Sequence, residues 1–322
     1  MNSRRYFIAG GAGFIGSHFT DRLLSDNAPA VTLYDNFSSG REWHYDQHRA
    51  DSRLRVIRGD VKDLDFLTNS MKGHDVVIHL ASNPDIARAA TEPEIDFREG
   101  TMLTNNVLEA MRRSGTRTIL YASGSGVYGD LGELEVAEHH GPLVPISTYG
   151  ASKLAGEALI SSYCHMFDFT GRAFRFGNVV GPRQTHGVGF DFLRKLMKDR
   201  HKLEILGDGT QSKSYIHVRD IVEAVLLSAE RPSERFAVYN VASDYITVTE
   251  IARLAAECAG LDPREVKFEY TGGSRGWKGD VPIVRLNTDR IRGLGWVCRM
   301  NSREALRDSM KAMLADLKAG RL

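Results

Sequence analysis

Apolar residues along the first half of the chain form short runs, and the segments between those runs have a helical period. Each run has the length of one buried strand and ends at glycine or at small polar residues. The intervening segments repeat apolar residues every three or four positions, as one face of a helix does. The pattern predicts strands at residues 5–9, 30–34, 54–57, 75–80 and 118–122, and helices at 14–24, 101–113 and 149–167.

Strands that alternate with helices predict an α/β fold, a Rossmann-type doubly wound parallel sheet with right-handed crossovers. The alternation continues to about residue 176 and then loosens. Beyond that point we expect a helix at 190–198, one strand at 236–241 and a helix at 247–258. We therefore predict a first domain over 1–180 and a smaller C-terminal domain over 181–322.

Composition and charge narrow the class of protein. Of the 322 residues, 42% are hydrophobic and 26% are charged, which is typical of a soluble globular chain. The net charge of +1 gives no reason to expect nucleic acid or a membrane surface as a partner. The longest apolar runs fall short of the roughly 18 residues that can span a bilayer. The first strand begins so early that no signal peptide is expected.

The spacing of the cysteines bears on the cellular compartment of the protein and on whether it binds a metal. Cys164, Cys258 and Cys298 lie far apart and lack the paired spacing of a metal site. We interpret them as free thiols in a reducing compartment, so the expected location is the cytoplasm. No metal is expected.

The first strand leads into a glycine-rich turn at Gly10, Gly13 and Gly16. A strand, a glycine turn and a helix in this order form the phosphate-binding unit of dinucleotide sites, because glycine permits the tight turn and a close approach to the pyrophosphate. The helix then begins at Phe14 and Ile15, whose turn offers unpaired N–H groups to phosphate.

Carboxylates follow the next two strands. Asp35 ends the second strand about 20 residues beyond the last glycine, where a carboxylate accepts from the ribose 2′-hydroxyl. It would repel a 2′-phosphate, so NAD is favoured over NADP. Asp60, after the third strand, is placed to accept from the adenine amine, and Val61 can offer its backbone. The fourth strand ends in Ala81 and Ser82, small residues where a cofactor must pass.

Tyr149 and Lys153 lie four residues apart at the start of a predicted helix, so both face one side of it. An ammonium within about 4–6 Å of a phenol favours the phenolate and lowers a pKa that starts near 10. Such a tyrosine is a usable general base near neutral pH. Lys153 can also bond the hydroxyls of the nicotinamide ribose.

The order and spacing of these motifs resemble the extended short-chain dehydrogenase/reductases, in the NAD-dependent epimerase/dehydratase family, and within them nucleotide-sugar epimerases of the UDP-galactose 4-epimerase type. The likeness runs nearly from end to end. Its landmarks are residues 10–16, 35–40, 59–60, 79–81, 127–129, 149 and 153, 175–178, 207–209, 214–220 and 275–280.

The resemblance implies a cofactor, an assembly and a site for substrate. Bound NAD would also contact Asn36, Ser38, Gly40 and Leu80. The second domain would bind the nucleotide sugar, with segments at about 210–245 returning to the first domain. Relatives pair the helices at 101–113 and 149–167 across a homodimer interface, for which Met102, Leu103 and Val107 are available. Substrate contacts are expected from Asn178, Lys213 and Arg275 on the diphosphate and from Val188 and Phe192 on the base.

The chain departs from the family at two positions. The family's catalytic Ser or Thr, which bonds the sugar oxygen, is replaced by Gly124. Ser123 and Ser125 flank it, but neighbours on an extended chain point to opposite sides, so either one serine is turned inward or Tyr149 works with water. Gly100 occupies the place of an Asn near the cofactor, which implies a roomier site or a weaker activity.

The implied function is a nucleotide-sugar 4-epimerase with tightly held NAD, for which UDP-glucose and UDP-galactose are the default pair. An oxidoreductase or decarboxylase of the same superfamily, a 2-epimerase, a dehydratase that uses unusual acids, and a non-catalytic NAD- or sugar-binding protein stay open. Dehydration by the usual route is not expected, because Ser125 and Gly126 stand where dehydratases have adjacent Asp and Glu.

Overall fold

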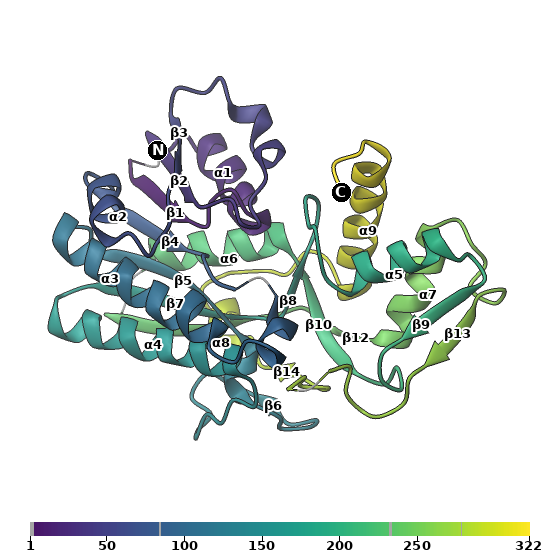
Figure 1. Cartoon of the computed structure of the whole chain (residues 1–322). Coiled ribbons are helices and arrows are strands. Elements are labelled where there is room, and N and C mark those ends of the chain that lie inside the picture. Colours follow the sequence, from purple (N-terminus) through teal and green to yellow (C-terminus); the bar gives the residue numbers. More distant parts are fainter. Residues whose placement is uncertain (1–2, 84, 232–233, 278) are drawn as a thin grey trace. The chain divides into compact units, whose positions relative to one another are not determined.

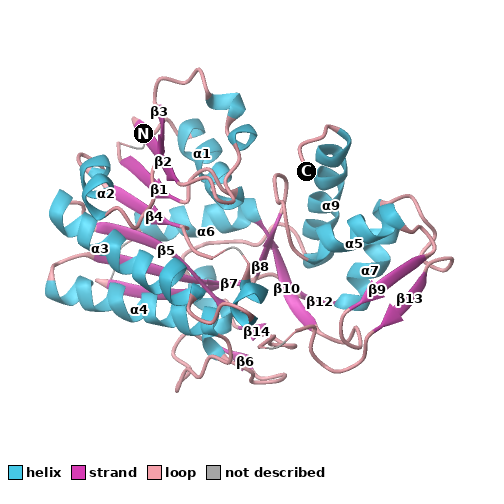
Figure 2. Ribbon diagram, viewed as in Figure 1, coloured by secondary structure: helices cyan, strands magenta, loops and turns pink. Residues whose placement is uncertain are grey.

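The computed structural model describes residues 3–83, 85–231, 234–277 and 279–322. The chain folds into two compact units. Unit 1 comprises 1–127, 147–175 and 222–239, and unit 2 comprises 128–146, 176–221 and 240–322. Figures 1 and 2 show the helices and strands of both units.

A seven-stranded sheet forms the centre of unit 1, in the order β11-β7-β5-β4-β1-β2-β3 (Figure 1). The pairs β1–β2, β1–β4, β2–β3 and β4–β5 are parallel. The order runs outward from β1 in both directions, which confirms the predicted doubly wound sheet and puts its switch point between β1 and β4. The strands are β1 Arg5–Ala9, β2 Ala30–Asp35, β3 Leu54–Arg58, β4 Val76–His79, β5 Thr118–Gly124, β7 Thr170–Phe176 and β11 Phe236–Val241.

Helices connect these strands, as the apolar period predicts. Helix α4 begins where the side chain of Ser147 accepts from the Gly150 N–H at 3.0 Å, so a serine cap fixes the start of the segment that carries Tyr149. The helices are α1 Phe14–Ser25, α2 Leu64–Met71, α3 Met102–Ser114, α4 Thr148–Met166 and α6 Val218–Glu230, with short turns η1 Glu42–His44, η2 Asp46–His48, η3 Ile86–Ala90, η5 Ser125–Tyr128 and the π-helical η4 Phe97–Thr101.

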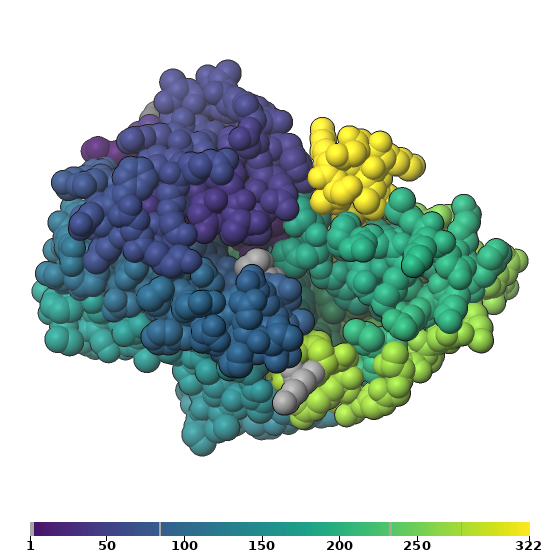
Figure 3. Space-filling view, viewed as in Figure 1, coloured from purple at the N-terminus to yellow at the C-terminus, as the bar shows by residue number. Residues whose placement is uncertain are grey.

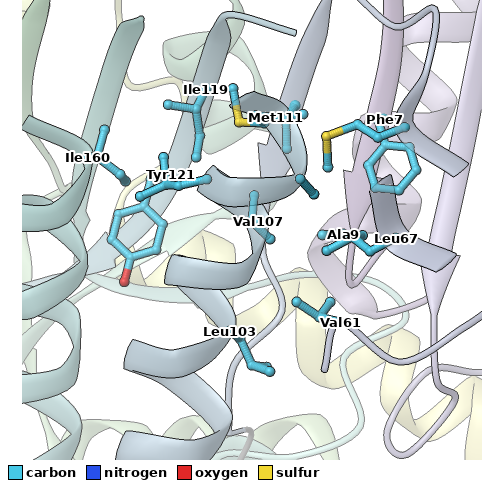
Figure 4. Close-up of a cluster of buried hydrophobic side chains, with 14 of the residues drawn as sticks. Phe7, Ala9, Val61, Leu67, Leu103, Val107, Met111, Ile119, Tyr121 and Ile160 are labelled. Carbon is cyan, nitrogen blue, oxygen red and sulfur yellow. The ribbon is translucent and has the colours of Figure 1, made fainter. Parts of the chain in front are cut away.

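The inner face of α3 corrects one expectation about the dimer. Leu103 is 5% exposed and Val107 is fully buried, and both lie in the cluster of apolar side chains between α3, α2 and the sheet (Figure 4). Burying each such side chain stabilises the fold by roughly 1.5–3 kcal/mol. These two residues are therefore committed to the core of unit 1 and are not available to a partner subunit, whereas Met102 is half-buried.

Unit 2 contains three small sheets, β12-β10-β8, β13-β9 and β14-β6. The sequence pattern predicted α5 and α7 but none of these strands, because two to six residues are too few to show a period of two. Helix α9 begins at a reciprocal cap between Asn301 and Glu304 and is drawn in yellow in Figure 3. The elements are β6 Glu135–Val136, β8 Asn178–Val180, α5 Val188–Lys198, β9 Lys202–Ile205, β10 Ser212–His217, β12 Tyr245–Thr247, α7 Val248–Cys258, β13 Lys267–Tyr270, β14 Arg285–Leu286, α8 Asp289–Arg292 and α9 Ser302–Lys318.

Each unit is built from three separate stretches of the sequence, whereas the prediction divided the chain once, at residue 180. Residues 128–146 belong to unit 2, because β6 within them pairs with β14 near the end of the chain. The segment that returns to unit 1 is 222–239, and its core is the body of α6 and most of β11.

Candidate functional site

The glycine-rich segment from the end of β1 to the first turn of α1 is too tight for side chains, as Gly10 and Gly16 illustrate. Gly10 has a φ of +80°, and a Cβ built on it would lie 2.8 Å from the Ala81 backbone nitrogen. A Cβ on Gly16 would lie 2.5 Å from the Gly11 carbonyl oxygen. The first position fixes the turn against the end of β4, and the second brings α1 close to β1.

The N-terminus of α1 offers donors to an anion. Gly13 is its N-cap, and among the described residues no side chain caps this end. A Cβ on Gly13 would meet only the Gly10 carbonyl oxygen, at 3.2 Å. The first turn, at Phe14 and Ile15, thus has no side-chain cap among the described residues, which fits the pyrophosphate of a dinucleotide.

Asp35 and Asp60 are the two carboxylates predicted to contact the adenosine of the cofactor. Asp35 is 8% exposed, and its carboxylate accepts from the Ala12 N–H at 3.0 Å and from the Phe37 N–H at 2.8 Å. Each oxygen keeps a lone pair for a ribose hydroxyl. Asp60 accepts from the Asn36 side-chain amide at 3.2 Å. The two carboxylates stand at the ends of neighbouring strands, as predicted.

The remaining predicted cofactor residues surround this loop. Gly40 is buried, and a Cβ there would lie 2.9 Å from an Asp35 carboxylate oxygen. The backbone N–H groups of Leu80 and Ala81 both donate to the Ala9 carbonyl, at 2.9 and 3.0 Å. The Ser38 N–H donates to the Asn36 side chain at 3.0 Å, and the side chain of Val61 is 6% exposed.

We expect the substitution Asp35→Asn to weaken NAD binding about tenfold, because hydrogen bonds to a charged group are worth roughly 1.5–3 kcal/mol. NADP binding should weaken less, since the repulsion of a 2′-phosphate is removed at the same time. Titration calorimetry with both dinucleotides measures this. Asp46→Asn, at an exposed carboxylate, is the matched control. Unchanged discrimination between NAD and NADP in Asp35→Asn would refute the role of Asp35.

Tyr149 and Lys153 are brought together on one face of α4, beside the end of β5. The ammonium of Lys153 lies 5.4 Å from the centroid of the Tyr149 ring and donates to the Ala122 carbonyl at 2.8 Å. Lys153 is 4% exposed, and burial lowers its pKa to about 8, against the opposite effect of Asp96. The pair thus lies at the carboxyl end of the sheet, within unit 1.

The pKa of Tyr149 corrects the expectation drawn from the spacing. Burial raises it to about 12, the neighbouring side chain of Ser82 acts in the opposite direction, and the charge of Asp96 raises it further. The ammonium of Lys153 donates its hydrogen bond to the carbonyl of Ala122. The phenol therefore holds its proton at neutral pH, and a positive charge close to it is needed to release that proton.

Of the two serines that flank Gly124, Ser123 already binds another side chain of the protein. Ser123 is 4% exposed and donates to the Glu157 carboxylate at 2.5 Å. Arg175 binds both oxygens of the same carboxylate, at 3.0 and 2.7 Å. This buried cluster was not predicted, although Glu157 follows Lys153 by one helical turn. Ser123 is therefore held away from substrate, whereas Ser125 is half-buried at the start of η5.

The two unusual glycines differ in what surrounds them. A Cβ on Gly124 would meet, among the described residues, only the ring of Tyr149, at 4.0 Å. A Cβ on Gly100 would lie 2.0 Å from the hydroxyl oxygen of Ser152. The space beside Gly100 is thus filled by a serine from α4, and the expected roomier site is not present there.

The predicted basic residues of unit 2 both bind Asp280, Lys213 through its carboxylate and Arg275 through its backbone carbonyl. Lys213 on β10 donates to Asp280 at 2.5 Å, and Arg275 donates to the Asp280 carbonyl at 3.0 Å. Arg275 also forms an ion pair with Asp130 at 2.7 Å. These carboxylates balance the two cations and orient them, so they are not isolated surface charges.

The other predicted substrate residues of unit 2 differ in their exposure. Asn178 begins β8, is exposed, and donates to the Ser214 carbonyl at 3.2 Å. Phe192 is 3% exposed in the core of unit 2, which leaves it no surface for a nucleotide base, and Val188 lies at the edge of that core. Lys278, within the 275–280 landmark, lies outside the described residues.

Two features that the described residues lack bear on other classes of protein. No group of His, Cys, Asp and Glu within 3–83, 85–231, 234–277 and 279–322 is arranged to hold a metal ion. In the same part of the chain, the helices are too short or too polar to cross a membrane.

Comparisons with known proteins agree with this architecture. Residues 6–242 match the NAD dependent epimerase/dehydratase family, and the chain belongs to it. A UDP-glucose 4-epimerase of Mycolicibacterium smegmatis is 32% identical over 91% of this chain and 93% of its own. A crystal structure of a UDP-galactose 4-epimerase has 37% identity and a TM-score of 0.86, over 97% of this chain and 99% of that one. The Thermus thermophilus UDP-glucose 4-epimerase, solved in complex with NAD, has 28% identity and a TM-score of 0.83, over 96% and 99%.

These matches confirm the predicted family and the predicted Rossmann-type fold. NAD is the cofactor of this family, and the glycine loop, the uncapped start of α1 and the carboxylate of Asp35 fit it.

Proposed function

We propose that this protein is a nucleotide-sugar 4-epimerase that inverts C4 through a transient 4-keto sugar with tightly bound NAD. UDP-glucose and UDP-galactose are the default pair, because relatives along the whole chain carry these names. The observation that carries the proposal is the pairing of Tyr149 with Lys153 at the end of β5, in the unit that also holds the glycine loop.

Each residue has a part in the proposed reaction. Bound NAD supplies the hydride acceptor and donor, and its oxidised ring supplies positive charge. Tyr149 takes the proton of the C4 hydroxyl and later returns it to the same oxygen. Lys153 fixes the end of β5 through Ala122 and offers its ammonium to ribose hydroxyls. Asn178, Lys213 and Arg275 are proposed to hold the diphosphate of the substrate, and Val188 to flank its base.

We further propose a homodimer in the cytoplasm. Helix α4 keeps an exposed strip of small residues, Ala151, Ala158 and Ser162, at helical spacing on the face turned away from the core. This strip suits close packing against the same helix of a second copy.

The test uses the purified protein without added cofactor. It is incubated with UDP-, dTDP- and GDP-sugars, including N-acetyl and uronic forms, and the products are identified by proton NMR and mass spectrometry. C4 inversion without a change in mass is the expected result. Loss of water or of carbon dioxide would instead place the protein in a neighbouring branch of the family.

A further inference from the structure

The side chain of Tyr121 extends from β5 toward helix α4, which carries Tyr149 and Lys153. Tyr121 is 2% exposed and belongs to the cluster of apolar side chains in unit 1 (Figure 4). A Cβ built on Gly156 would lie 2.4 Å from the Tyr121 hydroxyl oxygen. Glycine is unfavourable in the interior of a helix, and here it has a packing reason, because it lets the phenol lie directly against α4.

The ammonium of Lys153 lies over two aromatic rings. Its nitrogen is 5.2 Å from the centroid of the Tyr121 ring and 5.4 Å from the centroid of the Tyr149 ring. A cation within about 6 Å of a ring centroid is attracted by the negative face of the ring, and the attraction is stronger where water is excluded. Lys153 is 4% exposed, so its ammonium meets this condition.

The rings supply an attraction that the hydrogen bond of Lys153 does not. The ammonium has three N–H donors, and it donates to the Ala122 carbonyl, a neutral acceptor, at 2.8 Å. A buried cation without further compensation tends to lose its proton. The ring of Tyr121 offsets part of this cost and leaves N–H groups of the ammonium for the hydroxyls of a ribose.

The other charged and titratable groups around the ammonium come from three segments. Asp96, before η4, favours the charged form of Lys153. His79 on β4 packs against Tyr121, with ring centroids 5.5 Å apart, and burial together with the charge of Lys153 lowers the pKa of His79 to about 3. His79 is therefore neutral at physiological pH. Tyr149, on α4 itself, changes its protonation in the proposed reaction, whereas Tyr121 does not, because burial raises the pKa of its phenol.

We propose that Tyr121 is a positioning residue of the site, because the face of its ring holds the charged ammonium of Lys153 at the end of β5. The inference rests on the proposed function, since it concerns the same site. Tyr121 acts through Lys153 and transfers no proton itself. Its ring keeps the same charge distribution through the whole cycle, so it can hold the ammonium in place while Tyr149 takes and returns a proton.

The test removes the negative face of the ring and keeps the shape of the ring. Tyr121→pentafluorophenylalanine, made by amber suppression, has a ring of similar size whose face no longer attracts a cation, whereas Tyr121→Phe keeps that attraction. The pKa of Lys153 is measured with NAD bound, from the NMR signal of its side chain in protein that carries isotope-labelled lysine. The signal is identified by its absence in Lys153→Met.

We expect the fluorinated ring to lower the pKa of Lys153 by about 1 from its value of about 8, and Tyr121→Phe to leave it nearly unchanged. Turnover by the fluorinated variant should then be about fivefold lower than that of the parent at about pH 8, and nearly equal to it at about pH 6. A ring that serves only to fill the core would affect turnover equally at both pH values.

The matched control places the same fluorinated residue at Phe7. This residue is fully buried in the same apolar cluster, and its ring contacts those of Tyr34 and His74 at centroid distances of 5.5 and 5.4 Å. Phe7→pentafluorophenylalanine should therefore change neither the pKa of Lys153 nor the pH dependence of turnover.

Equal pKa values of Lys153 in the parent and in the fluorinated Tyr121 variant would overturn the proposal. An equal fall of that pKa in the Phe7 control would overturn it too, because the effect would then come from fluorine in the core and not from the ring face. If the parent protein turns over no sugar, the proposed function fails, whereas the NMR titration still decides whether the ring of Tyr121 acts on Lys153.

Discussion

The substitution Tyr149→Phe should lower turnover of the nucleotide sugar by about 10²- to 10⁴-fold, the range expected for losing a general acid–base group. It removes the phenol oxygen alone. Asp35 and the glycine loop bind each other through the Ala12 N–H and share no hydrogen bond with Tyr149 among the described residues, so the amount of NAD that copurifies should stay the same. Turnover is followed by NMR, and NAD is quantified after release from the denatured protein.

A second tyrosine on the same helix provides the control. Tyr163 donates to Glu109 at 2.6 Å, far along α4 from the end of β5, and Tyr163→Phe should retain full turnover. If Tyr149→Phe and the parent have equal rates, the phenol takes no part in the reaction. If both are inert on every sugar while binding NAD, the protein is a binding protein.

Turnover and stability should both change with pH as the ammonium of Lys153 loses its proton. Its pKa in the folded protein is about 8, so turnover that needs the ammonium should fall as the pH rises through 8. The unfolded chain holds this proton up to the ordinary value of 10.5. Between these two pH values the unfolded state binds more protons, so stability rises with pH there and this group opposes folding most fully below pH 8. Turnover rates across this pH range test the predicted fall in activity, and urea midpoints test the predicted rise in stability. A turnover rate that stays level through pH 8 would contradict the predicted need for the ammonium.

The substitution Arg175→Met should reduce the free energy of unfolding by about 3–5 kcal/mol, because it leaves the carboxylate of Glu157 buried without its cation. Glu157 and Arg175 have side chains that are 5% and 4% exposed, and they meet through two hydrogen bonds. The same carboxylate holds Ser123, so the end of β5 should also move relative to Tyr149. Urea unfolding measures the loss of stability.

An exposed ion pair provides the control for the effect of burial on the free energy of unfolding. Arg235 and Asp168 lie 2.8 Å apart with side chains that are 58% and 82% exposed, and Arg235→Met should cost less than about 1 kcal/mol. Removing both charges in Arg175→Met/Glu157→Leu should restore much of the lost stability. If Arg175→Met and Arg235→Met lower the free energy of unfolding by the same amount, the buried ion pair is not an important part of the core.

The sequence allowed correct prediction of those parts of the molecule that are determined by residues close together along the chain. The glycine turn, Asp35 at the end of the second strand and the helix that starts at Ser147 each follow from neighbouring residues. The prediction for Leu103 and Val107 was wrong because apolar residues at helical spacing do not tell which face of α3 is covered. The short strands of unit 2 were missed because they depend on pairing with distant segments.

The finer features of the site depend on contacts through space. Burial reverses the expected direction of the Tyr149 pKa, and burial is set by the whole fold. The choice between Ser123 and Ser125 was open in the sequence, and Glu157 decides against Ser123. The buried carboxylate of Asp96 joins the segments that hold Asn83 and Thr148, which no spacing along the chain reveals.

The most direct test of the account follows one hydrogen atom. UDP-galactose carrying deuterium at C4 is incubated in ordinary water with the purified protein and no added NAD. We predict UDP-glucose that keeps its deuterium at C4, because the same hydride leaves and returns within one bound cofactor. Deuterium released to water or into free reduced NAD, or a sugar whose C4 is not inverted, would contradict the proposed epimerase.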